Sequence, residues 1–112
     1  MGEDDKKLVW LARPGIETPP FSNEARVHAG YLLRLLQKGE FIEEPESKPM
    51  PEVCKNCHEL RIRDKNVWWR IIYHIADDAI ILLEIFKKKT RKTPDYVIAN
   101  AQYRYNRYYK DI

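Results

Sequence analysis

Three consecutive segments between residues 58 and 86 constrain the fold more than any other part of the sequence. Residues 58–63, 67–76 and 79–86 are dominated by Trp, Ile, Tyr and Val, the side chains that pleated sheets favour. Only a few residues separate them, and Asp77-Asp78 alone forms the second linker. Linkers this short join antiparallel strands. The sequence therefore predicts a three-stranded antiparallel meander.

One helix is expected before the meander and another after it. Residues 22–38 have apolar side chains at helical spacing, with Ser22 placed to cap the helix and Gly39 placed to end it. The apolar stripe of this helix comprises Ala25, Ala29, Leu32, Leu33 and Leu36. A second helix begins near Thr93-Pro94-Asp95. We therefore expect an α+β fold, in which a small antiparallel sheet is flanked by an N-terminal helix and a C-terminal helix.

Length and composition limit the class of protein. The chain has 112 residues, of which 44% are hydrophobic, enough for one core in a single domain over residues 1–112. Residues 1–6 are expected to be flexible, residues 7–12 to form a short strand before a turn at Arg13-Pro14-Gly15, and residues 40–53 to form an acidic, proline-rich loop. No apolar run reaches the roughly 18 residues of a membrane span, and none resembles a signal peptide. We expect a cytoplasmic protein with no membrane partner.

Charge is distributed unevenly along the chain. Residues 1–57 carry eight Lys and Arg against ten Asp and Glu, whereas residues 58–112 carry twelve against seven. The basic half is therefore the candidate surface for a polyanion. The alternative is a basic face that is merely solvated.

A provisional strand register gathers several of these cations. The turn between the first two strands places Arg61 opposite Arg70 and Arg63 opposite Trp68. The Asp77-Asp78 turn places Ala76 opposite Ala79, and with unbroken pairing Arg70 then faces Ile85 and Trp68 faces Lys87. One face of the sheet is expected to carry Arg61, Arg63, Trp68, Arg70, His74 and Lys87. The other face is expected to carry Leu60, Ile62, Trp69, Ile71, Tyr73, Ile75, Leu82 and Phe86.

Two directly opposed arginines need an explanation. Like charges on facing strand positions are destabilising, by about 0.2–1 kcal/mol. An anion between Arg61 and Arg70 would remove the repulsion, because guanidinium groups fork onto phosphate. Trp68 offers a surface on which a base can stack. The alternative is that Glu59 or Glu84 pairs with some of the arginines and the face only keeps the sheet soluble.

The sequence Cys54-Lys55-Asn56-Cys57-His58 matches the pattern of covalent haem attachment. Without a signal peptide, haem attachment is not expected. A zinc site would use Cys54, Cys57 and His58 with a fourth ligand from His28 or His74. A redox pair normally follows a strand and precedes a helix, and here that context is missing. We expect two reduced cysteines, with no metal and no cofactor.

A series of short motifs adds a resemblance over residues 8–109. The motifs are Trp10-Leu11, Leu36-Gln37-Lys38-Gly39-Glu40, Lys48-Pro49-Met50-Pro51, Glu59-Leu60-Arg61-Ile62-Arg63, Trp69-Arg70-Ile71-Ile72-Tyr73, Phe86-Lys87-Lys88 and Lys92-Thr93-Pro94. In this order they resemble the HigB-like branch of the RelE/ParE toxin superfamily, which includes phage-derived host-killing proteins. The resemblance implies the RelE/ParE-like fold and the toxin of a type II toxin–antitoxin pair. Its partners would be a helix-turn-helix antitoxin of the HigA-like kind, the ribosome and mRNA.

The resemblance also implies an activity, that of a ribosome-dependent mRNA endoribonuclease. Carried over residue by residue, it implies catalytic roles for Arg61, Arg70, Lys87 and Lys88. The register and the basic run after the last strand add substrate-binding roles for Arg63, Trp68, His74 and Lys89. The arginines would stabilise the charged transition state, while a Lys or His with a shifted pKa deprotonates the ribose 2′-hydroxyl. Three alternatives stay open, namely a ParE-like gyrase inhibitor, a non-catalytic RNA- or ribosome-binding module, and a metal or haem protein.

Overall fold

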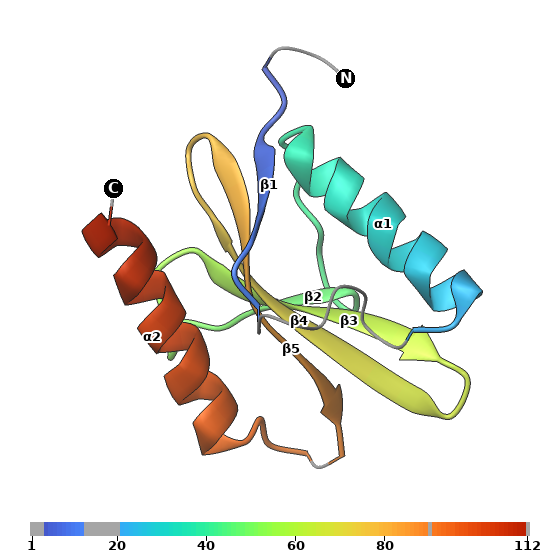
Figure 1. The fold of residues 1–112 in the computed structure, drawn as a ribbon. Helices are drawn as coiled ribbons and strands as arrows, with labels where there is room; N and C mark the ends of the chain where they lie inside the picture. The colour runs from blue at the N-terminus through green and yellow to red at the C-terminus, as the bar shows by residue number, and fades with distance from the viewer. Residues whose placement is uncertain (1–3, 13–20, 90, 112) are drawn as a thin grey trace.

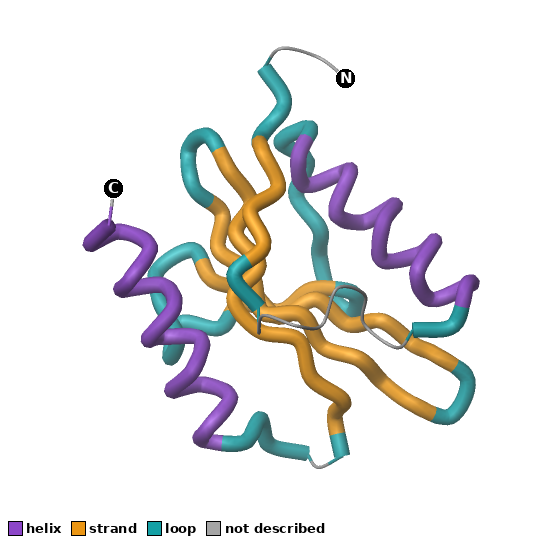
Figure 2. Tube along the Cα trace, in the orientation of Figure 1, coloured by secondary structure: helices purple, strands orange, loops and turns teal. Residues whose placement is uncertain are grey.

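The computed structural model describes residues 4–12, 21–89 and 91–111, so the turn expected at Arg13-Pro14-Gly15 lies outside the described residues. Its elements are β1 (Lys7–Trp10), α1 (Asn23–Gln37), β2 (Ser47–Pro49), β3 (Cys57–Asp64), β4 (Val67–Ile75), β5 (Ala79–Lys88) and α2 (Asp95–Asp111). The strands form one sheet in the order β1-β5-β4-β3-β2, with the two helices on either side of it (Figures 1 and 2). The predicted α+β class with two flanking helices is confirmed.

The edges of the sheet differ from the expected antiparallel meander. Strand β1 runs parallel to β5, with Lys7 paired to Ala79, so the sheet is mixed. Strand β2 lies inside the segment expected to be a loop and pairs antiparallel with β3, with Ser47 opposite Leu60. Short edge strands of three or four residues carry too little alternation to reveal their pairing. The described part of the segment expected to be flexible makes contacts, because Lys6 N donates to Gln37 O at 2.7 Å.

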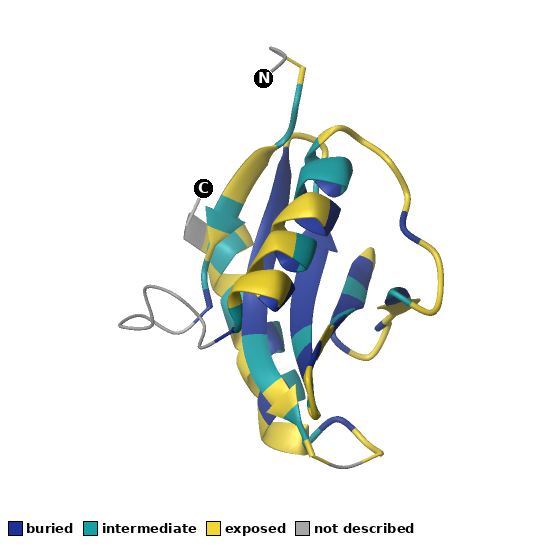
Figure 3. Ribbon diagram, turned by 90° about the vertical axis from the view of Figure 1, so that its right-hand side faces the viewer, coloured by how far each residue is buried: buried dark blue, intermediate teal, exposed yellow. Residues whose placement is uncertain are grey.

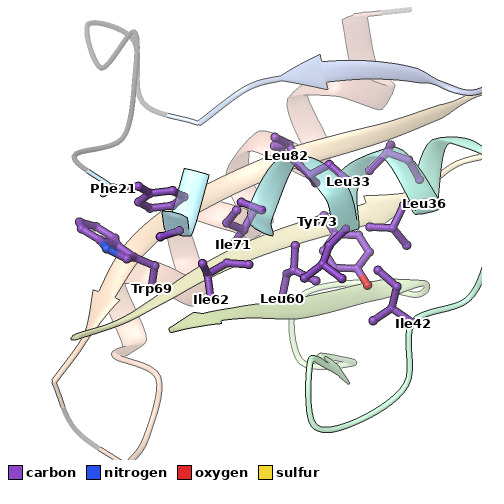
Figure 4. Close-up of a cluster of buried hydrophobic side chains, with 14 residues drawn as sticks. Phe21, Leu33, Leu36, Ile42, Leu60, Ile62, Trp69, Ile71, Tyr73 and Leu82 are labelled. Atoms are coloured by element: carbon purple, nitrogen blue, oxygen red, sulfur yellow. The ribbon is translucent and has the colours of Figure 1, made fainter. Parts of the chain in front are cut away.

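Helix α1 covers one face of the sheet and makes the larger core. Its five predicted apolar positions are all buried, and the Ser22 side chain accepts a hydrogen bond from Ala25 N at the N-cap. The stripe packs against Leu60, Ile62, Trp69, Ile71 and Tyr73 of the central strands (Figure 4). Figure 3 shows this helix turning its buried side toward buried strands. The register of β3 and β4 therefore directs the apolar face toward α1, as predicted.

Helix α2 covers part of the opposite face. Val97 and Ala101 are buried against Ile72, Ile81 and Leu83 of the sheet. These sheet residues lie toward the β4–β5 turn, whereas Arg61 and Arg70 lie toward the β3–β4 turn. Helix α2 thus leaves the arginine-bearing half of its face uncovered. Neither helix among the described residues is long and apolar enough to cross a membrane.

A β-bulge changes the register of β5. Ile72 pairs with Glu84 and Tyr73 pairs with Leu82, so Leu83 is an extra residue in β5. The predicted pairs of Arg70 with Ile85 and of Trp68 with Lys87 are therefore wrong. Arg70 faces Phe86, and Trp68 faces Lys88. Beyond the bulge, the β5 side chains lie on the face opposite to the one predicted. Phe86 therefore lies on the α2 side and Lys87 on the α1 side.

Candidate nucleic-acid interface

The predicted pairing of β3 and β4 is confirmed and brings three arginines together. Arg61 lies opposite Arg70, and Arg63 lies opposite Trp68. All four side chains share one face of the sheet because their positions alternate with the buried residues of the α1 core. Beside Arg61, strand β2 has ended, and only the backbone of Glu46 continues the pairing, with Arg61 N donating to Glu46 O at 2.8 Å. Arg61 and Arg63 therefore lie beyond the end of the edge strand β2, while Arg70 lies on the central strand β4.

Glu59 is a buried carboxylate that contacts several cations of this face. Its side chain is only 2% exposed, and Oε1 accepts a hydrogen bond from Arg70 Nε at 3.1 Å. Arg61 Nε lies 3.6 Å from the same oxygen. Oε2 accepts a hydrogen bond from the Thr93 hydroxyl, which in turn accepts one from Lys88 Nζ. The alternative that Glu59 pairs with some of the arginines is thus confirmed.

One carboxylate does not neutralise the whole cluster. Arg61, Arg70 and Lys88 surround Glu59, Lys48 lies opposite it on β2, and Arg63 lies farther along β3. Arg70 Nη1 and Arg61 Nε are buried with no hydrogen-bond partner among the described residues. A buried donor on a charged group is costly to leave unpaired. The face therefore combines excess positive charge with unpaired guanidinium donors. We call these five cations with Glu59 the cationic face.

A cavity of about 310 Å³ opens on the cationic face. It is lined by Arg61, Arg63, Trp68 and Arg70 from the sheet and by His28, Pro45 and Glu46 from the neighbouring helix and loop. His28 Nε2 lies 3.0 Å from Glu46 Oε2, which closes one side of the cavity. The size suits a small charged group such as a phosphate with part of its sugar.

Trp68 forms the flat wall of the cavity. Its side chain is 43% exposed, and the Arg63 and Arg70 guanidinium carbons lie 5.7 and 5.5 Å from the ring centroid. Cations at these distances are attracted to the indole ring. The ring is therefore held in place while it presents a surface to solvent. An exposed aromatic ring beside cations is the arrangement that binds single-stranded nucleic acid.

Lys88, and not Lys87, belongs to the cationic face. Lys88 contacts Thr93, whereas Lys87 lies 5.4 Å from the Trp69 ring on the α1 side. Burial lowers the pKa of the Lys88 amine, as do Arg70, Arg61 and Lys48, and Glu59 raises it. Burial likewise lowers the pKa of Arg70, with Glu59 opposing that shift. Lys89 is exposed immediately after β5.

His74 shares the strand face of Arg70 but not its surroundings. It is only 4% exposed and lies four residues farther along β4, about 13 Å away. Its Nε2 bonds the Tyr109 hydroxyl of α2 at 2.7 Å, and its Nδ1 faces the sulfurs of Cys54 and Cys57. The structure therefore places His74 under α2 and apart from the arginines.

The cysteines differ from the expectation of two reduced thiols, because Cys54 and Cys57 form a disulfide. Asn56 takes a left-handed φ of 60°, and this turn brings the two Cα atoms to 5.3 Å. His58 does not join them, since its ring stacks on Tyr73 with centroids 5.4 Å apart. Adjacent strand residues point to opposite faces, which separates His58 from Cys57. The residue beside the cysteines is His74.

The sequence did not reveal that Lys48 belongs to the cationic face or that Thr93 bonds its Glu59 and Lys88. Lys48 lies in the short strand β2, where the neighbouring prolines lead the sequence to predict a loop. Thr93 is buried just before α2, and its sequence context predicts only the start of a helix. The predicted pairing of Arg61 with Arg70, continued one residue past the expected strand start at His58, sets Cys57 opposite His74 and so gives a signal for this pair of residues.

The fold and this face define a small α+β protein with a cationic surface on an open sheet, suited to a phosphate-bearing polymer. The chain belongs to the family of phage-derived Gp49-like proteins (DUF891), whose family model matches residues 19–106. Comparison with curated proteins and with solved structures finds no match. The family agrees with the phage-derived part of the resemblance seen in the sequence. Assignment to the HigB-like branch stays a prediction.

Proposed function

We propose that this protein is the toxin of a type II toxin–antitoxin pair and cuts mRNA on the translating ribosome. The observation that carries the proposal is the cationic face, where three arginines line a cavity with an exposed indole wall and Lys88 lies opposite that indole on β5. Phosphate contacts supply affinity for RNA, and stacking holds a base without demanding one sequence. Membership of the Gp49-like family and the resemblance to the RelE/ParE toxins support the same function.

The geometry supports a division of roles in phosphodiester cleavage. Arg61 and Arg70 face each other across β3 and β4, so both guanidinium groups reach one phosphate. As the ribose 2′-oxygen bonds to phosphorus and the 5′-oxygen leaves, they stabilise the added negative charge. The leaving 5′-oxygen takes a proton from solvent, so the products are a 2′,3′-cyclic phosphate and a 5′-hydroxyl end.

Lys88 is the residue best placed to accept the 2′-hydroxyl proton. Its lowered pKa increases the fraction of neutral amine near pH 7 compared with an ordinary lysine. Thr93 holds the amine beside the arginines. His74 has no part in this scheme, because it is buried beneath α2. The proposed catalytic residues are therefore Arg61, Arg70 and Lys88, with Arg63 and Trp68 binding RNA.

Adjacent lysines on opposite faces of β5 provide the sharpest test. The protein, Lys88→Gln and Lys87→Gln are expressed separately from an inducible promoter in a bacterial host, and growth and the 5′ ends of a reporter mRNA are followed. Lys88→Gln is expected to abolish arrest and cleavage, whereas Lys87→Gln retains both. Arg70→Ala is a poorer test, because removing Arg70 also takes an ion-pair partner from the buried Glu59.

Other outcomes of the same experiment distinguish the alternatives. Growth arrest with intact mRNA and DNA-damage signalling would indicate a ParE-like gyrase inhibitor. No arrest, with the protein bound to ribosomes, would indicate a non-catalytic binding module. Equal loss of cleavage in both lysine variants would contradict the roles assigned from the register of β5.

A further inference from the structure

A second cluster of reactive side chains lies under α2, away from the cationic face. Cys54 and Cys57 come from the segment that enters β3, and His74 comes from the facing position on β4. All three are buried, with exposures of 8%, 2% and 4%. Their two sulfurs and one ring nitrogen lie within 4.8 Å of one another. The RNA-cleavage proposal uses none of these residues.

The distances fit a tetrahedral metal ion. His74 Nδ1 lies 3.5 Å from Cys54 Sγ and 3.9 Å from Cys57 Sγ. With bonds of about 2.3 Å to sulfur and about 2.05 Å to nitrogen, a tetrahedral zinc ion separates a sulfur from a nitrogen ligand by about 3.6 Å. The two sulfurs would need to move apart to about 3.8 Å on the same geometry. Only the sulfur pair must open, and reduction of the disulfide allows this.

The far side of His74 is also arranged as metal-bound histidines usually are. A histidine ligand generally donates its second ring N–H to a fixed oxygen, which sets the tautomer and the ring orientation. Here Nε2 lies 2.7 Å from the Tyr109 hydroxyl, and Tyr105 packs edge-on against the ring with centroids 4.9 Å apart. With Nε2–H donating to Tyr109, Nδ1 keeps its lone pair directed at the sulfurs.

We propose that the reduced protein binds one zinc ion through Cys54 Sγ, Cys57 Sγ and His74 Nδ1, with Tyr109 positioning the histidine. The spacing of two residues between the cysteines is typical of zinc sites, and three protein ligands leave the fourth position to water. The ion would join the segment before β3 to β4 and, through Tyr109, to α2. Disulfide formation and zinc binding exclude each other because both use the same sulfurs.

A phosphine reductant breaks the disulfide with one water molecule, giving two thiols and the phosphine oxide. Zinc then replaces the two thiol protons, which are released to solvent. Two molecules of a small thiol reduce the same bond through a mixed disulfide and leave joined as one disulfide.

Cobalt is the probe for the test, because its absorption reports both thiolate ligands and tetrahedral geometry. The full chain is reduced with a phosphine, freed of reductant without oxygen, and titrated with Co²⁺ and then Zn²⁺. We expect one Co²⁺ to bind per chain and to give a sulfur-to-cobalt charge-transfer band. The band should disappear when Zn²⁺ displaces the Co²⁺. The oxidised protein serves as an internal control and should bind no cobalt with this spectrum.

Variants separate His74 from the histidine that adjoins the motif in sequence. Cys57→Ser and His74→Ala should lose the band, whereas His58→Ala should keep it, with folding checked by circular dichroism. Tyr109→Phe should retain the band but bind zinc about 10- to 100-fold more weakly. The proposal is overturned if the reduced protein binds no cobalt, if the oxidised protein binds it equally, or if His58→Ala abolishes the band and His74→Ala does not.

Discussion

Glu59 is the one negatively charged residue of the cationic face. Neutralising it should therefore show whether the face binds an anion. In Glu59→Gln the amide still accepts a hydrogen bond from Thr93, but Arg61 and Arg70 lose their counterion. Breaking a buried ion pair from one side costs about 3–5 kcal/mol. Because the Thr93 bond persists, we expect a loss near the lower limit, about 3 kcal/mol. With a urea slope of about 2 kcal/mol/M, the unfolding midpoint falls by about 1.5 M.

Phosphate should restore part of this stability, because an anion can occupy the space between the two freed arginines. Phosphate stabilises folded proteins in general, so a matched control is needed. Glu84→Gln removes the other buried carboxylate that pairs with an arginine, here Arg104 at 3.0 Å. Urea unfolding is measured in phosphate and in chloride at equal ionic strength. Recovery that is equal in the two variants, or no loss of stability in Glu59→Gln, would refute the reasoning.

Four further predictions concern binding and pH. Trp68→Ala should weaken binding of single-stranded RNA by about 1–3 kcal/mol. Arg63→Gln should reduce the slope of log affinity against log salt by about 0.7. Fluorescence anisotropy measures both quantities, and an unchanged affinity or slope would contradict the corresponding prediction. Hydrogen bonds from Ser22 hold the pKa of Asp64 below 3.8, so this stabilisation is complete above pH 3.8 and is lost as pH falls through the lower, folded-state pKa. Urea unfolding at several acidic pH values should show that loss in the protein and a weaker one in Asp64→Asn. Burial places the pKa of Lys88 below 10.5, so the single-turnover cleavage rate should rise with pH and level off below 10.5, while Lys88→Arg shows no such rise.

The α1 core and the β3–β4 register could be predicted because each rests on an unambiguous periodicity. Ala25, Leu32 and Leu36 repeat at helical spacing, and all are buried. The pairing of Arg61 with Arg70 follows from a short turn between strands of clear alternation. Where local pattern and tertiary packing agree in this way, sequence alone determines the geometry.

The bulge at Leu83 could not be predicted from the same rules. Residues 79–83 form an uninterrupted apolar run, so alternation does not show which side chain faces α1. The extra residue places Lys88 on the arginine-bearing face and Lys87 on the α1 side, so the predicted register put the wrong lysine on that face, whereas the resemblance named both. The Cys54–Cys57 disulfide depends on the backbone turn at Asn56, which composition does not specify.

The central claim is that the cationic face cleaves RNA while the ribosome presents it. The direct measurement uses purified protein, purified ribosomes and a defined mRNA, with and without a codon in the ribosomal A site, and analyses the ends of the fragments. We predict cleavage only of ribosome-bound mRNA, with 2′,3′-cyclic phosphate ends, lost in Lys88→Gln and kept in Lys87→Gln. Intact mRNA under all conditions, or cleavage that persists unchanged in Lys88→Gln, would contradict it.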